Sequence, residues 1–339
     1  IELKDPSLLK PQAFINGRWC GGDNDEYFEV INPATQEVIA QVASVGEQET
    51  RRAIEAAQAA LPLWQAQPAK QRSQILRRWF DLIMANQEDL ARIMTCEQGK
   101  PLSESRDEIA YGASFIEWFA EEAKRVYGDI IPSGGNDKRL LTIKQPVGVV
   151  AAITPWNFPS AMLARKAGPA LAAGCTFVIK PAKETPLSAL ALAELADRAG
   201  LPAGVLNIVV GSRSSAIGNE LTQNPLVRKL TFTGSTPVGK QLLKQSADTV
   251  KKVSMELGGN APIIVFDDAD LDKAVAGAVA SKYRNAGQTC ICANRILVQD
   301  SIMDAFVEKF TAAVQTLVLG NGLDHTVNLG PLINQDALE

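Results

Sequence analysis

The 339-residue sequence has only one histidine, His325. Structural zinc sites need four cysteine or histidine ligands, so a mixed His/Cys zinc site is not expected. Acid–base catalysis by histidine is not indicated either, and we predict that no metal is bound. Cysteine is also scarce. Five cysteines are an odd number and too few for a disulfide framework: Cys20, Cys96, Cys175, Cys290 and Cys292.

An excess of charge of one sign is lacking as well. The 34 basic and 38 acidic residues give a net charge of -4, so no surface that binds nucleic acid or anionic membranes is expected. No run reaches the roughly 18 apolar residues of a membrane span. The first residues, IELKDPSLLK, carry charges where a signal peptide has an apolar core. These features predict a cytoplasmic protein that binds a small molecule.

The chain is long enough for two domains, and its pattern changes along its length. From Glu49 to about Arg125, apolar residues recur every three or four positions, as in amphipathic helices. From Val147 onward, short β-branched runs alternate with helical segments. These runs are almost continuously apolar, which is typical of parallel strands buried on both faces. We therefore predict an α/β fold with a parallel sheet.

The predicted elements of this sheet region are VGVVAAIT, a helix at Met162–Leu171, TFVIK, a helix at Leu187–Arg198, VLNIVV, a short helix and KLTFTG. After ELGGNAP, a second unit is predicted from PIIVFDDAD, a helix from Leu271 to Asn285 and the strand RILVQ. Between the helical region and the sheet region, Lys138 to Gly148 alternates polar and apolar residues. This alternation predicts a strand pair or an extended arm.

The stretch LTFTGSTPVGKQLL (residues 230–243) resembles a triphosphate-binding loop, because Gly234 is followed after four residues by a Gly-Lys pair. The apolar strand PIIVFDD could then supply an aspartate for magnesium. Two features argue against this function. Gln241 stands where a magnesium-binding hydroxyl is needed, and Pro237 removes a backbone N–H from the loop. The alternatives are a glycine-rich turn before a helix and a helix N-terminus that binds a dinucleotide pyrophosphate.

Cys290 lies in the polar segment NAGQTCICAN, whereas Cys175 lies among apolar residues. An exposed, polar setting favours a reactive thiol, and an incidental loop thiol is the alternative. With no histidine nearby, a thiol nucleophile needs another base and an oxyanion donor. Glu256 before a Gly-Gly pair is the candidate base, and Asn157 after an apolar strand is the candidate donor. Alternatively, Glu256 is a solvated helix end and Asn157 forms a turn.

Four motifs, TPWNFP, FTGSTPVG, MELGGN and GQTC, occur in the order and approximate spacing of the aldehyde dehydrogenases, and the resemblance covers the whole chain. EQGKPLSE, ASFIEWFAEEAKR, RKAGPALAAG, NPLVRKLTFTGST and KYRNAGQTCICANR are similar to bacterial succinate-semialdehyde dehydrogenases, which are often associated with 4-aminobutyrate breakdown. The resemblance implies a Rossmann-like NAD(P)-binding domain at residues 1–127 and 146–256. It further implies a small β oligomerisation arm at 128–145, an incomplete α/β catalytic domain at 257–339, and a homo-oligomer, either a dimer or a tetramer.

The resemblance also implies catalytic roles. Cys290 would attack the aldehyde as a thiolate, while the Asn157 side chain and the backbone N–H of Cys290 would stabilise the oxyanion of the thiohemiacetal. Hydride would then pass to the nicotinamide, and Glu256 would activate the water that hydrolyses the thioester. A free thiol has a pKa of about 8.5, so a neighbouring base or a favourable local field is needed near neutral pH.

In this family the loop FTGSTPVG binds a dinucleotide, so its phosphates would be those of a nicotinamide cofactor. NAD-preferring relatives carry, at the position of Lys183, a glutamate that binds the ribose hydroxyls. Lysine reverses that charge, so we expect NADP to be preferred and NAD to be possible; a solvated surface lysine is the alternative. The implied cofactor-binding residues are Thr154, Pro155, Trp156, Lys180, Ala182, Lys183, Gly211, Phe232, Thr233, Gly234, Ser235, Val238 and Leu257.

Two arginines bear on the substrate. Arg165 and Arg284 match positions that grip the distal carboxylate in succinate-semialdehyde dehydrogenases, and arginine suits a bidentate carboxylate pair. Arginine is otherwise common on helix surfaces. The resemblance therefore implies succinate semialdehyde as the substrate, with glutarate semialdehyde or another ω-carboxy aldehyde as the alternative.

Three further expectations concern the same region. Cys290 and Cys292 form a C-x-C pair whose disulfide would cap the nucleophile under oxidation, unless Cys292 simply packs. The sequence stops at NQDALE, before the Glu-x-Phe-Gly-Pro stretch and the closing strand of the family, so the catalytic domain is expected to be incomplete. A P-loop NTPase and a non-catalytic NADP-binding fragment are the other two classes of function, and neither accounts for Cys290, Glu256 and Asn157 together.

Overall fold

The computed structural model describes residues 1–339 and is built around a seven-stranded sheet. The strands are β1 (Ala13–Ile15), β2 (Arg18–Cys20), β7 (Val149–Ile153), β8 (Thr176–Lys180), β9 (Leu206–Ile208), β10 (Val227–Thr233) and β11 (Lys252–Glu256). Their order is β11-β10-β7-β8-β9-β1-β2. Strands β11, β10, β7, β8 and β9 pair in parallel, and β1 and β2 extend the sheet as antiparallel strands.

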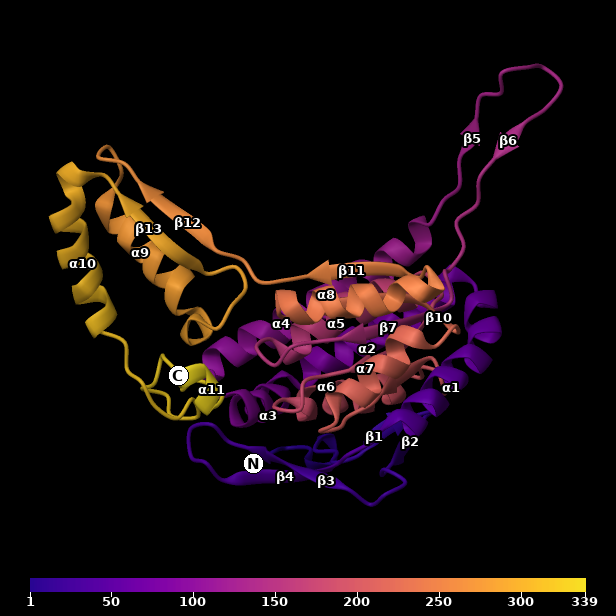
Figure 1. Cartoon of the computed structure of the whole chain (residues 1–339), viewed down its shortest axis with the longest axis horizontal. Helices are drawn as coiled ribbons and strands as arrows, with labels where there is room; N and C mark the ends of the chain where they lie inside the picture. Colours follow the sequence, from indigo (N-terminus) through magenta and orange to yellow (C-terminus); the bar gives the residue numbers. More distant parts are fainter.

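Eight helices surround this sheet (Figure 1). They are α1 (Glu47–Ala66), α2 (Ala69–Ala85), α3 (Gln87–Gln98), α4 (Leu102–Glu122), α5 (Pro159–Ala172), α6 (Pro186–Arg198), α7 (Ser214–Gln223) and α8 (Thr236–Ser246). Helices α5 and α6 pack on the sheet and on each other, and α2, α3 and α4 pack outside them. Helix α1 contacts α7, which contacts α8. Two helical layers therefore enclose the sheet, as the apolar character of its central strands requires.

Burial explains why these segments form strands. Every residue of β8 is buried, and only the last residue of β7 is partly exposed. Strands covered on both faces lose apolar surface to water on both faces, which is the main favourable contribution to folding. The prediction of an α/β fold with a parallel sheet is confirmed.

Two antiparallel pairs lie outside the sheet. Strands β3 (Tyr27–Ile31) and β4 (Val38–Ala43) form one pair, and β5 (Ile130–Ile131) and β6 (Leu140–Leu141) form the other. The β5–β6 hairpin projects away from the body of the molecule (Figure 1). The strand pair predicted around Lys138–Gly148 is therefore present, although only two residues of that segment are in a strand.

A smaller unit follows β11 and lies apart from the main sheet (Figure 1). It contains β12 (Ala261–Val265), α9 (Leu271–Tyr283), β13 (Ala293–Val298) and α10 (Met303–Gln315), and the chain ends with α11 (Gln335–Leu338). Strands β12 and β13 pair in parallel, and α9 packs against α10 and β13. Short 3-10 helices complete the chain: η1 (Pro6–Leu8), η2 (Ala123–Arg125), η3 (Ala247–Thr249), η4 (Arg284–Gly287) and η5 (Asp300–Ile302).

Two sequence predictions of element length were wrong. VLNIVV forms a strand only at Leu206–Ile208. The helix predicted to reach Asn285 ends at Tyr283, because Asn285 and Ala286 have positive φ values of 52° and 55° that a right-handed helix cannot accommodate. The domain boundaries stay a prediction. No helix is both long enough and apolar enough to cross a membrane.

Candidate active site

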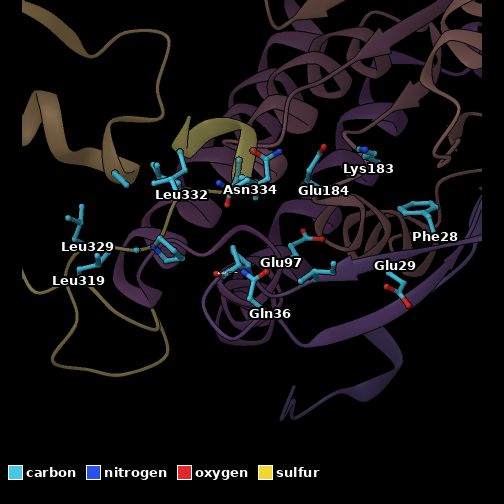
Figure 2. Close-up of a pocket in the computed structure, with 18 of the residues that line it drawn as sticks. Phe28, Glu29, Gln36, Glu97, Lys183, Glu184, Leu319, Leu329, Leu332 and Asn334 are labelled. Carbon is cyan, nitrogen blue, oxygen red and sulfur yellow. Dashed lines mark hydrogen bonds between the residues drawn. The ribbon is translucent and has the colours of Figure 1, made fainter.

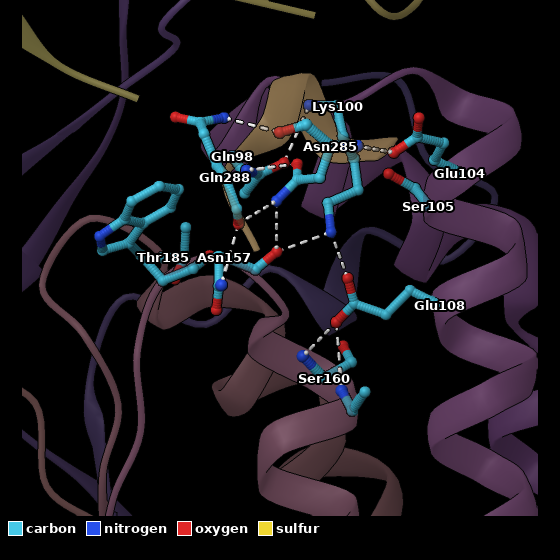
Figure 3. A network of polar contacts seen from close by, with 12 residues as sticks. Gln98, Lys100, Glu104, Ser105, Glu108, Asn157, Ser160, Thr185, Asn285 and Gln288 are labelled. Atoms are coloured by element: carbon cyan, nitrogen blue, oxygen red, sulfur yellow. Dashed lines mark hydrogen bonds and ion pairs between the residues drawn. The ribbon is translucent and has the colours of Figure 1, made fainter. Parts of the chain in front are cut away.

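Asn157 joins two distant motifs of the sequence. It lies between β7 and α5, beyond the carboxyl end of a central strand. Its side-chain Nδ2 donates a hydrogen bond of 3.0 Å to the backbone carbonyl of Gln288 (Figure 3). Its Oδ1 is buried and has no hydrogen-bond partner. The TPWNFP motif is thereby linked to GQTC, two residues before Cys290.

Cys290 lies in a turn between η4 and β13 and is half-buried, with a free thiol. Helix α9 ends at Tyr283, well before Cys290, and the left-handed residues Asn285 and Ala286 lie between them. A Cβ atom on Gly259 would lie 2.9 Å from the Cys290 carbonyl oxygen. Glycine is therefore needed for this approach, and it brings the MELGGN segment against the cysteine loop.

Glu256 is the last residue of β11 and is exposed. Its backbone carbonyl accepts a hydrogen bond of 3.0 Å from Gly234 N, while its carboxylate forms no ion pair. The alternative prediction for Glu256, a solvated helix end, is therefore wrong, because this residue ends a strand. The carboxylate stands at the carboxyl edge of the sheet, three residues before Gly259.

The cofactor-binding residues predicted from the sequence share this edge of the sheet. The edge contains a topological switch point, because β8 and β10 flank β7 on opposite sides, and such crevices are the usual ligand sites of open α/β sheets. The predicted residues follow or end successive parallel strands: Thr154, Pro155 and Trp156 after β7, Lys180 and Ala182 at β8, Gly211 after β9, Phe232, Thr233, Gly234 and Ser235 at β10, and Leu257 after β11.

The polar groups at this edge fit a dinucleotide. The hydroxyls of Thr154 and Thr233 are buried without any hydrogen-bond partner. Helix α8 begins with Ser235 at its N-cap, but no side chain caps it and no acidic residue lies in its first turn. Its first N–H groups therefore remain available to an anion. Val238, in the first turn, is exposed on this helix.

The two lysines expected near the ribose differ in environment. Lys180 is buried and its Nζ donates to the carbonyl of Pro181 at 3.2 Å. Burial lowers the pKa of Lys180 to about 8. Lys183 is exposed and lines a cavity of about 850 Å³ (Figure 2).

That cavity lies between β3, the loop carrying Lys183 and Glu184, and the segment at residues 319–338. Cys290, Asn157 and Glu256 do not line it. The cavity therefore lies beside Lys183, and the candidate catalytic residues lie outside it.

The loop carrying Lys183 is held by a carboxylate that the sequence analysis missed. Glu97, at the end of α3, is fully buried and accepts hydrogen bonds from Leu187 N at 2.7 Å and Ser188 N at 2.8 Å. These donors are the first N–H groups of α6, which starts directly after this loop. Burial raises the pKa of Glu97 to about 8.

A second buried group lies beside Asn157 (Figure 3). Lys100 and Glu108 form a fully buried ion pair, and Lys100 Nζ also donates to the Asn157 carbonyl at 2.8 Å. Burial lowers the pKa of Lys100. The other carboxylate oxygen of Glu108 accepts from Ser160 N at 3.0 Å and Ala161 N at 3.1 Å, in the first turn of α5.

Sequence analysis passed over this pair as well. One signal was available, because Glu108 lies among Ser105, Ile109 and Gly112 on the face of α4 that is buried. A carboxylate on a buried helix face needs a partner, since an unpaired buried charge is costly.

The two arginines expected to bind substrate each lie against an aromatic ring. The Arg284 guanidinium lies 4.8 Å from the centre of the Phe158 ring, and that of Arg165 lies 5.3 Å from the Phe115 ring. Phe158, Met162 and Arg165 are spaced by three or four residues and therefore share one face at the start of α5. Arg284 is exposed and Arg165 is half-buried.

Cys292 is buried, and both thiols of the C-x-C pair are free. The Cys292 Sγ donates to the carbonyls of Gly287 and Thr289, each at 3.3 Å. These contacts describe a packed thiol, and the redox disulfide stays a hypothesis. No group of three or more His, Cys, Asp and Glu side chains is arranged to hold a metal ion.

Comparison with known proteins identifies the family of the chain. Residues 19–339 match the sequence model of the aldehyde dehydrogenase family. The chain is 65% identical to the glutarate-semialdehyde dehydrogenase of Pseudomonas putida over 338 residues, which are 100% of this chain and 70% of that protein. It is 63% identical, with the same coverage of both chains, to the NADP-dependent succinate-semialdehyde dehydrogenase GabD of Escherichia coli.

A crystal structure of an E. coli NADP-dependent enzyme superposes with a TM-score of 0.98 at 63% identity, over 99% of this chain and 69% of the other. The family model covers nearly the whole chain, and the relatives share well over half of its residues. Members of this family are NAD(P)-dependent oxidoreductases that act on aldehydes. The chain belongs to the aldehyde dehydrogenase family.

Proposed function

We propose that this protein oxidises an aldehyde with a distal carboxylate, with succinate semialdehyde as the first candidate, and that NADP is its preferred cofactor. The observation that carries the proposal is the link between Asn157 and the cysteine loop, because it joins a neutral amide to the residues that precede a half-buried thiol. Gly259 packs against the Cys290 carbonyl, and Glu256 ends β11 three residues before it. A nucleophile, an oxyanion donor and a base thus come from three separate segments.

In the first step the Cys290 sulfur, as thiolate, forms a bond to the aldehyde carbon, and the π electrons of the C=O bond move to its oxygen. The Asn157 amide and the backbone N–H of Cys290 donate hydrogen bonds to that oxygen. Donors aimed at a developing oxyanion are typically worth about 10²–10³ in rate. The Asn157 amide nitrogen carries two N–H groups, and one of them donates to the Gln288 carbonyl, so the second remains for the oxyanion.

NADP, when bound at the carboxyl edge of the sheet, supplies the nicotinamide ring that takes the hydride from the substrate carbon. Cys290 is then left as a thioester. Glu256 removes a proton from a water molecule, the water oxygen adds to the thioester carbon, and the C–S bond breaks to release the carboxylic acid and the thiolate. The exposed Glu256 carboxylate has no ion-pair partner that would hold it away from such a water.

Arg165 and Arg284 support a substrate with a distal carboxylate. Arg284 lies against Phe158, directly after Asn157, and Arg165 lies on α5 against Phe115. Succinate semialdehyde and glutarate semialdehyde differ by one methylene, which is worth only about 1–3 kcal/mol of discrimination in an apolar pocket. Glutarate semialdehyde is therefore the second candidate, and the P. putida relative at 65% identity carries that name.

The preference for NADP is supported by Lys183, which is exposed and forms no ion pair, so its charge is available to a 2′-phosphate. The E. coli relative at 63% identity is named as an NADP enzyme. We also propose that the protein is a homo-oligomer that uses the β5–β6 hairpin, on which Ile130, Leu141 and Ile143 are largely exposed.

Turnover tests the proposal directly. The purified protein, with its intact mass determined, is assayed for NADPH or NADH formation with succinate semialdehyde, glutarate semialdehyde and acetaldehyde. Turnover that is selective for the carboxylated aldehydes, and faster with NADP, supports the proposal. Selectivity for acetaldehyde would contradict the substrate class, and faster turnover with NAD would contradict the cofactor.

Arg284→Ala separates the carboxylate contact from the chemistry. We expect KM for succinate semialdehyde to rise at least about tenfold, because a charged hydrogen-bonded pair is lost, while acetaldehyde is affected little. Arg18→Ala is the matched control, since Arg18 is an exposed arginine on an edge strand with no ion pair. Equal losses for both aldehydes would rule out a carboxylate-binding role for Arg284.

A further inference from the structure

The backbone carbonyl of Asn157 is held by two side chains. Lys100 Nζ donates to this oxygen at 2.8 Å and Asn285 Nδ2 donates to it at 3.1 Å (Figure 3). The two donors come from opposite directions in the sequence, one from the turn before α4 and one from the turn before Cys290. The backbone oxygen of Asn157 is therefore held by side chains from two separate segments of the chain.

Lys100 is itself held firmly. Its ammonium group is fully buried, pairs with Glu108 and lies 4.1 Å from the centre of the Phe158 ring. Glu108 is fixed in turn by the first two N–H groups of α5. A buried charge loses its hydration, and burial accordingly lowers the pKa of Lys100. A buried ion pair is a poor means of stabilising a fold, so its retention beside Asn157 calls for another purpose.

Asn285 extends the same arrangement to the cysteine loop. Its Oδ1 accepts from Gln98 Nε2 at 2.9 Å, and its backbone N–H donates to Glu104 at 2.9 Å. Its Nδ2 also donates to Gln288 O at 3.3 Å, the same carbonyl that accepts from the Asn157 side chain. Asn285 has a left-handed backbone, a conformation that side chains such as asparagine tolerate best.

We propose that Lys100 is a positioning residue for the oxidation, which fixes the backbone of Asn157 so that its amide stays aimed at the Cys290 loop. The proposal rests on the proposed function, because it takes Asn157 as the oxyanion donor. Lys100 touches neither the substrate nor the cofactor in this scheme and acts only through Asn157. Glu108 holds the lysine, and Asn285 supplies the second contact to the carbonyl.

The addition of Cys290 to an aldehyde isolates the step in which Asn157 acts. The sulfur forms a bond to the aldehyde carbon, the C=O π bond becomes a lone pair on oxygen, and the thiol proton ends on that oxygen. No oxidant is needed, and the adduct is reversible. Because the adduct blocks the thiol, the aldehyde protects Cys290 from alkylation by iodoacetamide, and mass spectrometry of the Cys290 peptide measures that protection.

The test compares four proteins: the unaltered protein, Asn157→Ala, the double variant Lys100→Met/Glu108→Gln, and the triple variant that combines all three changes. The double variant removes both buried charges together, so no unpaired charge remains. Its new amide at position 108 keeps an oxygen that can still accept from the first N–H groups of α5. For each protein, the concentration of butanal or succinate semialdehyde that halves the alkylation rate is determined relative to its own rate without aldehyde.

We expect Asn157→Ala and the double variant each to raise the half-protecting concentration about tenfold, the effect of one lost hydrogen bond of this kind. The triple variant should show no further rise, because residues that act through one group are not additive. The rise should be the same for butanal and for succinate semialdehyde, since Asn157 acts at the aldehyde oxygen and not at the distal carboxylate.

Three results would overturn the inference. Protection that weakens in Asn157→Ala but not in the double variant would leave the proposed function intact but show that Lys100 does not position Asn157. Multiplicative losses in the triple variant would show the same, because Lys100 and Asn157 would then act independently. Protection that does not weaken in Asn157→Ala would overturn both the role of Lys100 and that of Asn157.

Lys251→Met is the matched control for a merely structural effect. Lys251 is also a buried lysine whose ammonium donates to the backbone carbonyl of an asparagine, Asn224 at 3.0 Å. Removal of its contact should lower Tm as the double variant does but leave the half-protecting concentration unchanged. An equal loss of protection in Lys251→Met would show that the effect comes from loosened packing and would overturn the proposed role.

Discussion

The sheet unit and the smaller unit that carries Cys290 differ greatly in their cores. The main apolar core contains 58 buried residues, whereas the core of the smaller unit contains four: Val265, Val275, Ala278 and Phe306. Large apolar side chains such as Ile264, Phe266 and Leu297 are mostly exposed on the smaller unit. Apolar burial is the dominant favourable term in folding. The smaller unit buries few apolar side chains, so its own core contributes little to holding a loop rigidly.

This difference indicates which unit holds the loop of Cys290 in place. Asn285 and Gln288 precede Cys290, and both are hydrogen-bonded to groups of the sheet unit: Gln98, Glu104 and Asn157. The cysteine loop thus belongs to the smaller unit by sequence but is fixed by the larger one. Its geometry should therefore depend on the main core and on these polar contacts more than on the packing around α9 and α10.

The largest expected effect is a truncation in the main core. Trp79 is 1% exposed, and its indole N–H donates to the Leu192 carbonyl at 3.0 Å. Trp79→Ala should lower the free energy of unfolding by about 3–5 kcal/mol, because a large buried side chain leaves a cavity. Denaturant unfolding measures the loss. Trp118→Ala is the control, since Trp118 is 64% exposed, and a loss of equal size there would contradict the assignment of the core.

A truncation in the smaller core should cost less and act locally. Phe306 is 3% exposed, and we expect Phe306→Ala to destabilise the smaller unit by about 1–3 kcal/mol, because its sparse surroundings can relax into the cavity. Hydrogen exchange should accelerate in β12 and β13 and stay unchanged in β7 and β8. Phe266→Ala, at a position 61% exposed, should change neither. Accelerated exchange throughout both units would mean that the two cores unfold as one.

The sequence alone was sufficient for the parts of the molecule that follow a local pattern. The strands at 149–153 and 176–180 were predicted because continuous apolar runs are required where both faces of a sheet are covered. Cys290, Asn157 and Glu256 were predicted from motifs, although the helix before Cys290 was predicted too long. Asparagine tolerates the left-handed region well, but Ala286 gives no signal for it. Tertiary contacts such as the bond from Gln98 hold Asn285 in this conformation.

The buried charges could not be predicted in the same way. Glu97 and Lys100 look like ordinary polar residues at a helix end, and the backbone groups that they hold lie 90 and 57 positions away in the sequence. Only the fold brings those partners together. A buried carboxylate or ammonium is stable only when it is paired or hydrogen-bonded, so its presence implies partners without identifying them.

Cofactor choice sharpens the comparison, because Lys183 belongs to the sheet unit and lies far in sequence from the core of the smaller unit. Lys183→Glu should shift the ratio of NADP to NAD affinity toward NAD by about 10–100-fold, since the glutamate repels a 2′-phosphate and can bind ribose hydroxyls. Titration of each cofactor, followed by protein fluorescence, measures the ratio. Lys244→Glu, an exposed lysine in the last turn of α8, is the control. An unchanged ratio in Lys183→Glu would refute the assignment, and Phe306→Ala should leave the ratio unaltered.

The smallest expected effect is a pH dependence of NADP binding that arises from Lys180. Burial lowers the pKa of this lysine to about 8, so the folded protein loses its charge between about pH 7 and pH 9, while the unfolded chain stays protonated to about pH 10.4. A lowered lysine pKa means that burial of the charge costs stability below about pH 8, and that this cost disappears as the pH rises.

Over that range, NADP affinity should therefore fall severalfold, while the cost of Lys180 burial to the stability of the fold decreases. Lys180→Met should bind NADP more weakly at pH 7 and lose most of the pH dependence, whereas Lys183→Met, with an exposed lysine, should keep it. A dependence that persists in Lys180→Met would assign the titration to another group. Phe306→Ala should titrate like the unaltered protein, because the packing around Lys180 belongs entirely to the sheet unit.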